Sequence, residues 1–197
     1  MTAELAEIPF ADPSLLDSVQ RLRAMRDKLF DLTARYDAEK DPRAVVSYCL
    51  GRMQDVLATH IEQQEVEFAD PEWIALLAEK LHDRWINACL EFDLDPASPR
   101  VPLPHRAIFS TLKGTPCTVI EALIFPFAAH FIHDLPYALI DARFLEGAHQ
   151  SDFNTVNREL AGEIENLVQR PTSATTAAQP ASARFTRCVG RIQHSAW

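Results

Sequence analysis

Residues 69–92, ADPEWIALLAEKLHDRWINACLEF, decide the fold class. Asp70 followed by Pro71 is a helix start, because the acid offers an N-cap oxygen and the proline suits the first turn. From there the apolar side chains recur at helical spacing along one narrow stripe, which comprises Ile74, Leu77, Leu81, Trp85, Ala88 and Phe92. The stretch therefore predicts an amphipathic helix with one buried face.

The same start signal occurs twice nearer the N-terminus. Asp12-Pro13 predicts a helix that runs to about residue 38, and Asp41-Pro42 predicts a second that runs to about residue 67. After the third helix, residues 93–104 are rich in proline and are expected to form a loop. A short helix over about 105–112 should follow it.

The most apolar segment, residues 117–145, contains Pro126 and Pro136, which predict a central helix that bends or breaks. Ser151-Asp152 is expected to cap a last helix that ends near residue 169. Residues 1–169 therefore predict an all-α, single-domain bundle of about six helices with a proline-kinked central helix. Residues 170–197 are interpreted as a low-complexity linker and a basic C-terminal tail.

Charge and composition exclude several classes of protein. The net charge of −9 argues against a nucleic-acid partner, because phosphate contacts need clustered Lys and Arg. The longest apolar run, residues 117–132, is interrupted by Glu121 and His130 and is shorter than a membrane span, so no membrane partner is expected. Four scattered cysteines without a CxxC pair, and no secretory signal in the first residues, favour a cytoplasmic protein.

The segment AAHFIHDLPYAL, residues 128–139, places ionisable groups inside this apolar region. His130, Asp134 and Tyr137 fall on one side of a helix, with His133 at its edge. His130 and Asp134 are one turn apart, so the carboxylate can accept a hydrogen bond from the imidazole. A buried acid–base pair is predicted here, although a purely structural pair is the alternative.

Two other helices carry polar residues on their apolar faces. His60 and Gln64 continue the stripe of the second helix, and Asn157 lies on the stripe of the last one. A buried polar group without a partner costs about 1–3 kcal/mol, so such groups should meet each other, a water molecule or a ligand. We therefore expect the three helices to converge on a polar pocket.

Other histidines and motifs give weaker indications. His82 falls opposite the Trp85 stripe and is expected to be solvated, whereas His105 can be either a helix cap or a pocket wall. The sequence has no P-loop, no GxGxxG and no HExxH, which disfavours nucleotide-dependent chemistry. No serine has a local signature of a nucleophilic triad.

Residues 128–139, followed by DFNTVN at residues 152–157, resemble the signature of a family known as domain of unknown function 5995. That signature is approximately Asn-Ala-His-Ile-Asn-x-Asp-Leu-Pro-x-Ala-Leu and then Asp-Phe-x-x-Val-Asn, and the similarity extends over residues 43–169. His133 stands where the family often has Asn. The resemblance implies an all-helical domain with a polar site and supports His130, Asp134, Leu135, Pro136, Asp152, Phe153 and Asn157.

Three functions remain open. The favoured one is a cofactor-independent enzyme of cyclase, isomerase, lyase or hydrolase type that acts on a small apolar molecule, with His130 and Asp134 as the catalytic pair. Its expected substrate-binding residues are His60, Gln64, Trp85, His133, Tyr137, Asp152 and Asn157. The second is a Zn or Fe site on His130, His133 and Asp134. The third is a helical interaction module that can form a homo-oligomer, in which the buried polar groups only fix helix register.

Overall fold

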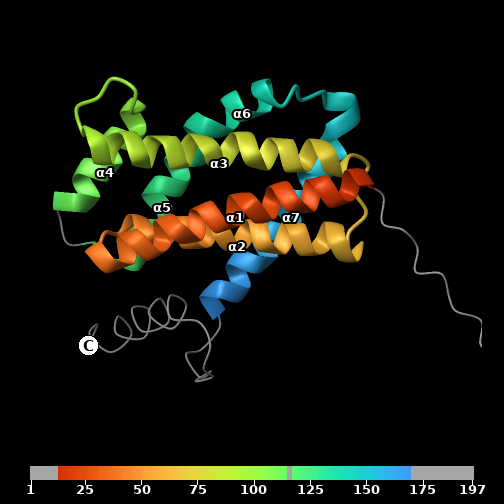
Figure 1. Cartoon of the computed structure of the whole chain (residues 1–197), viewed down its shortest axis with the longest axis horizontal. Helices are drawn as coiled ribbons and strands as arrows, with labels where there is room; N and C mark the ends of the chain where they lie inside the picture. Colours follow the sequence, from red (N-terminus) through yellow and green to blue (C-terminus); the bar gives the residue numbers. More distant parts are fainter. Residues whose placement is uncertain (1–12, 115–116, 170–197) are drawn as a thin grey trace, which may run out of the picture.

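A computed structural model describes residues 13–114 and 117–169, which form seven α-helices and one π-helical turn (Figure 1). The three longest elements of the first half are α1 (Pro13–Glu39), α2 (Arg43–Gln63) and α3 (Pro71–Leu94). Helix α1 packs along both α2 and α3. The described residues contain no strand, so the prediction of an all-α single domain is confirmed for this part of the chain.

The Asp-Pro signals act through specific hydrogen bonds. The Asp70 carboxylate accepts from the Trp73 N–H at 2.9 Å, and Asp41 accepts from the Arg43 N–H at 2.9 Å. Helix α2 ends at Gln63, earlier than the predicted end near residue 67. The reason is Gln64, whose φ of 53° is left-handed and turns its N–H back onto the last carbonyls of the helix.

The second half of the described chain contains α4 (Leu103–Gly114), α5 (Val119–Ala129), the π-helical turn η1 (His130–Asp134), α6 (Leu135–Asp141) and α7 (Glu146–Gln169). A capping box between Thr118 and Glu121 starts α5. Pro126 lies inside α5 and Pro136 in the first turn of α6, so η1 lies between the two prolines. The predicted kinked central segment is thus built from three elements joined end to end.

Helix α7 begins five residues before the predicted cap at Ser151-Asp152. Asp152 serves a different helix, because its carboxylate accepts from the N–H groups of Ala69 at 2.9 Å and Asp70 at 2.7 Å, directly ahead of α3. Asp152 is buried, so it ties α7 to the start of α3. The predicted tail, residues 170–197, lies outside the described residues.

The core lies between α1, α2 and α3, and the later helices close it. Helix α5 packs on α2 and α6 packs on α3, so the segment that contains η1 crosses both of these helices. Trp85 of α3 is fully buried at this crossing and donates from Nε1 to the Ser47 hydroxyl at 3.2 Å. Its ring packs edge-on against Phe109 and His130. The core therefore fixes the position of the π-helical turn.

Candidate active site

The π-helical turn η1 gathers two histidines around one carboxylate. His130 Nδ1 lies 2.9 Å from Asp134 Oδ2, and His133 Nδ1 lies 2.9 Å from Oδ1. His130 and Asp134 are 0% and 1% exposed. Because an ionised carboxylate only accepts hydrogen bonds, both Nδ1 atoms must carry the proton. The predicted pairing of His130 with Asp134 is therefore present, and π-helical turns often mark functional sites.

A third histidine approaches the same carboxylate from α4. His105 is fully buried, and its Nε2 lies 3.0 Å from Asp134 Oδ2. The N–H direction of that nitrogen is not aligned for a hydrogen bond, and neither ring nitrogen has a hydrogen-bond partner among the described residues. The sequence left His105 open as a cap or a pocket wall. In the structure it is the third imidazole of this cluster.

The surroundings set the charge of the pair. Burial would raise the pKa of Asp134, but the contacts with His105 and His130 outweigh it and hold the pKa well below its usual value. Burial lowers the pKa of His130, and its hydrogen bond to the Asp134 carboxylate offsets this only in part. His130 is thus a neutral imidazole beside an ionised carboxylate. Its Nε2 carries a lone pair and is buried without a hydrogen-bond partner among the described residues.

His82 of α3 is a second neutral imidazole at this site. Its Nδ1 lies 2.7 Å from the Ala78 carbonyl oxygen, which can only accept, so Nδ1 carries the ring proton. The Gln54 amide nitrogen lies 3.0 Å from the same Nδ1, while Gln54 Oε1 is buried without a partner. A half-turn of this amide would place the oxygen against the proton. Burial lowers the pKa of His82 to about 3.

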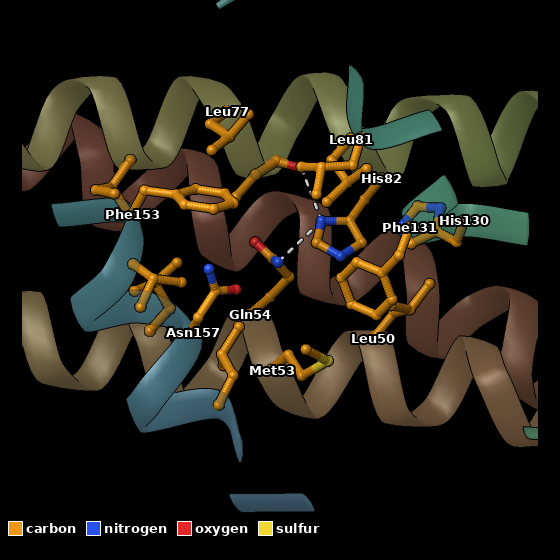
Figure 2. Close-up of a pocket in the computed structure, with 16 residues that line it drawn as sticks. Leu50, Met53, Gln54, Leu77, Leu81, His82, His130, Phe131, Phe153 and Asn157 are labelled. Carbon is orange, nitrogen blue, oxygen red and sulfur yellow. Dashed lines mark hydrogen bonds between the residues drawn. The ribbon is translucent and has the colours of Figure 1, made fainter. Parts of the chain in front are cut away.

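A cavity lies beside these two imidazoles, between α2, α3, η1 and α7 (Figure 2). His130 stands at one end with its ring facing His82, and Asn157 of α7 reaches in from the other side. The remaining walls are mostly apolar and include Leu50, Leu81, Phe131 and Phe153. The cavity has a volume of about 60 Å³. That is room for a few water molecules.

Three of the predicted pocket residues lie away from this cavity. His60 is near the end of α2, where its Nδ1 pairs with Glu65 at 3.1 Å. Gln64 is exposed and borders a separate surface hollow, because the left-handed turn carries it off the stripe of α2. Asp152 holds the backbone ahead of α3. Of the polar residues predicted to converge from three helices, His130 and Asn157 line the cavity, and those of α2 do not.

Three other predicted residues surround the His130–Asp134 pair at its back and outer side. Trp85 packs its ring edge-on against His130, with centroids 6.2 Å apart. His133 is partly exposed and holds the outer carboxylate oxygen of Asp134. Tyr137 is half exposed and its ring lies tilted against that of His133, under the Arg84 guanidinium. These three residues orient the His130–Asp134 pair and do not line the cavity, whereas His130 does.

His82 and Gln54 were not predicted as site residues, and His105 was predicted as either a helix cap or a pocket wall. His82 was expected to be solvated but is 4% exposed, because α6 and η1 also pack on α3 and bury a wider face than the Trp85 stripe. Gln54 lies four residues after Leu50 and three before Leu57 on the buried face of α2. That spacing is a signal in the sequence that could have identified it.

A sequence model described as a family of unknown function, DUF5995, matches residues 17–196. The chain belongs to DUF5995. The match confirms the resemblance seen at residues 128–157, and it runs past residue 169, where the sequence predicted a linker and tail. No curated protein and no solved structure shows significant similarity to this DUF5995 protein.

Proposed function

We propose that this DUF5995 protein is an enzyme that transfers a proton to or from a small, largely apolar molecule, with His130 as the acid–base group. The observation that supports this most strongly is the Nε2 of His130, which is buried without a hydrogen-bond partner among the described residues in a side chain that lines the cavity. A buried polar atom without a partner costs about 1–3 kcal/mol. A ligand in the cavity would supply the missing partner.

The neighbours of His130 suit this role. Asp134 accepts a hydrogen bond from the Nδ1–H of His130, so the Nε2 lone pair is available to remove a proton from a substrate. The imidazolium that forms would be stabilised by the same carboxylate, 2.9 Å away. The neutral ring of His82 lies against His130, with centroids 5.4 Å apart. Isomerisation, elimination, cyclisation and hydrolysis all use such a proton transfer.

The walls limit the substrate. Apolar side chains dominate the cavity, so the bound part of the substrate is apolar, with one polar group near His130 and another near Asn157. A molecule larger than the present volume would have to move α7, which borders the cavity through Phe153, Val156 and Leu160. We expect substrate entry between α7 and η1.

The test compares two buried histidines. His130→Gln removes the basic ring nitrogen of a residue that lines the cavity. His149→Gln is the control, because His149 of α7 is buried against Trp73 and does not line the cavity. Small apolar ketones, alkenes and esters are screened by ligand-observed NMR, and binders are assayed for turnover. His130→Gln should lower turnover by about 10²- to 10⁴-fold, and the control should retain it. Equal turnover in both variants would reject the proposal, and no binder at all would favour the interaction module.

A metal-dependent enzyme is the second candidate. Ligand atoms of His105, His130 and Asp134 all lie within 4.8 Å of one another, and all three residues are buried. The unaligned Nε2 of His105 fits a ligand that shares a metal with the carboxylate, and Zn or Fe suits this donor set. The sequence had suggested His133 in place of His105. Elemental analysis of protein purified without chelators decides between the candidates: less than about a tenth of an equivalent of Zn or Fe removes this one.

A further inference from the structure

The outward face of α5, η1 and α6 is almost entirely apolar. Ile120 is 66% exposed and Ile132 is 78% exposed. Over residues 120–140, Glu121 is the one exposed side chain that carries a formal charge. We call this surface the apolar strip; it comprises Ile120, Ile124, Phe125, Phe131, Ile132, Tyr137 and Ile140.

The apolar strip is large enough to indicate that another surface packs against it. A helical segment of this length extends over about 30 Å, and contiguous apolar surface on that scale usually marks a contact site. By length and composition alone, residues Ile120–Asp141 would also be able to cross a membrane. However, the inner face of the segment packs on α2 and α3 and carries the buried Asp134. The segment therefore needs a cover on one side only.

The C-terminal residues of this chain have the amphipathic pattern that a segment packed on the apolar strip requires. Phe185, Cys188, Val189 and Ile192 follow the i, i+3, i+4, i+7 spacing of one helix face, and Arg184, Arg187 and Arg191 fall on the opposite face. Residues 170–197 contain four arginines and no acid, whereas residues 1–169 carry 15 basic and 28 acidic groups. The charges of the two parts are thus complementary.

Two further observations favour this chain's own tail over another partner. The family match ends at residue 196, so residues 184–196 belong to the region that DUF5995 members share. Residues 170–183 lie between Gln169, the end of α7, and this amphipathic pattern. Fourteen residues reach up to about 45 Å when extended, which exceeds the length of the strip.

We propose that residues 184–197 pack the apolar side chains of their pattern against the apolar strip and leave their arginines on the outer side, where the net negative charge of the body favours them. This contact is independent of the proposed enzymatic function. It covers Phe131 and Ile132 of η1, the turn that carries His130. The tail is then an integral layer of the domain.

The test is proximity cross-linking in the full chain. Cys188 is the natural thiol of the tail, Cys49 and Cys89 are buried, and Cys117 is replaced by Ser. A second thiol is introduced by Ile132→Cys on the strip or, as the control, by Gln20→Cys on the exposed side of α1. A short bismaleimide should link Cys188 within one chain about tenfold more efficiently in the strip variant, because docking raises the local thiol concentration. Equal yields in the two variants, or links between chains, would overturn the proposal.

A second measurement distinguishes the other possible occupants. Ile192→Asp should release the tail and raise the binding of a hydrophobic dye several-fold, whereas Thr186→Asp, which lies off the apolar face of the pattern, should not. Unchanged dye binding in Ile192→Asp contradicts the proposal. A dimer in sedimentation that survives Ile192→Asp would assign the strip to a second copy of the chain. Flotation of the unmodified protein with phosphatidylcholine vesicles would assign it to a lipid surface.

Discussion

Replacement of Asp134 by Asn is expected to lower the free energy of unfolding by about 2–4 kcal/mol at pH 7. The carboxylate contacts His130 and His133 at 2.9 Å and His105 at 3.0 Å. Hydrogen bonds to a charged group contribute about 1.5–3 kcal/mol each. The amide keeps one oxygen as an acceptor, but its NH₂ group faces an imidazole N–H, so one or two of these contacts are lost.

The stability lost in Asp134→Asn should depend on pH. The pKa of Asp134 is lowered in the folded protein, so its contribution is fully present above the pKa of the unfolded chain, near 4. The contribution is lost as the pH falls toward the lowered pKa of the folded state. The difference in stability between the natural protein and Asp134→Asn should therefore be constant from pH 5 to 7 and shrink below about pH 4.

Urea denaturation followed by circular dichroism measures this difference. Asp141→Asn is the matched control, because Asp141 pairs with Arg84 at 2.6 Å on the surface and should contribute less than about 1 kcal/mol. If Asp134→Asn loses no more stability than Asp141→Asn, the carboxylate is not the ionised centre of the cluster. An increase in stability would refute the reasoning as well.

Three further predictions concern stability. Burial lowers the pKa of His82 to about 3. As the pH falls, His82 is therefore protonated in the unfolded chain before it is protonated in the folded protein. Between pH 6 and 4 this lowers the free energy of unfolding by about 1.4 kcal/mol per pH unit. Urea titrations at several pH values should show that the free energy of unfolding of His82→Phe depends less steeply on pH than that of the natural protein. Identical slopes in the two proteins would contradict a buried, neutral His82. Asp152→Ala leaves two backbone N–H groups ahead of α3 without their acceptor and should cost about 2–4 kcal/mol in the same assay; a cost below about 0.5 kcal/mol would contradict this role. Gly51→Ala would place a methyl group 2.6 Å from the Phe30 ring and should cost about 1–3 kcal/mol; an unchanged midpoint would mean that the ring moves aside freely.

The helix starts could be predicted from the sequence because their chemistry is local. Asp70 and Asp41 cap backbone N–H groups two or three residues ahead. The predictions of helix ends were wrong where the deciding contact or conformation has no local signal in the sequence. Asp152 resembles a cap for its own helix, but its partners lie more than 80 residues earlier in the chain. Gln64 ends α2 in a left-handed conformation without a glycine to announce it.

In the candidate site, too, the local contacts could be predicted from the sequence and the contacts between distant residues could not. His130 and Asp134 lie four residues apart, so helical spacing alone brought them together. His105 and His82 reach the cluster from other helices, and no local spacing specifies that meeting. His82 was assigned to solvent because one apolar stripe of α3 was visible, whereas α6 and η1 bury a second face of that helix.

Nitrogen-15 NMR of the His130 ring measures the protonation state on which the proposed acid–base role depends. We expect a neutral ring at pH 7 that is protonated on Nδ1 by its contact with Asp134 and bears a lone pair on Nε2. This state should persist as the pH falls below the ordinary imidazole pKa near 6.5. A ring protonated on Nε2, or on both nitrogens, at pH 7 would contradict the account.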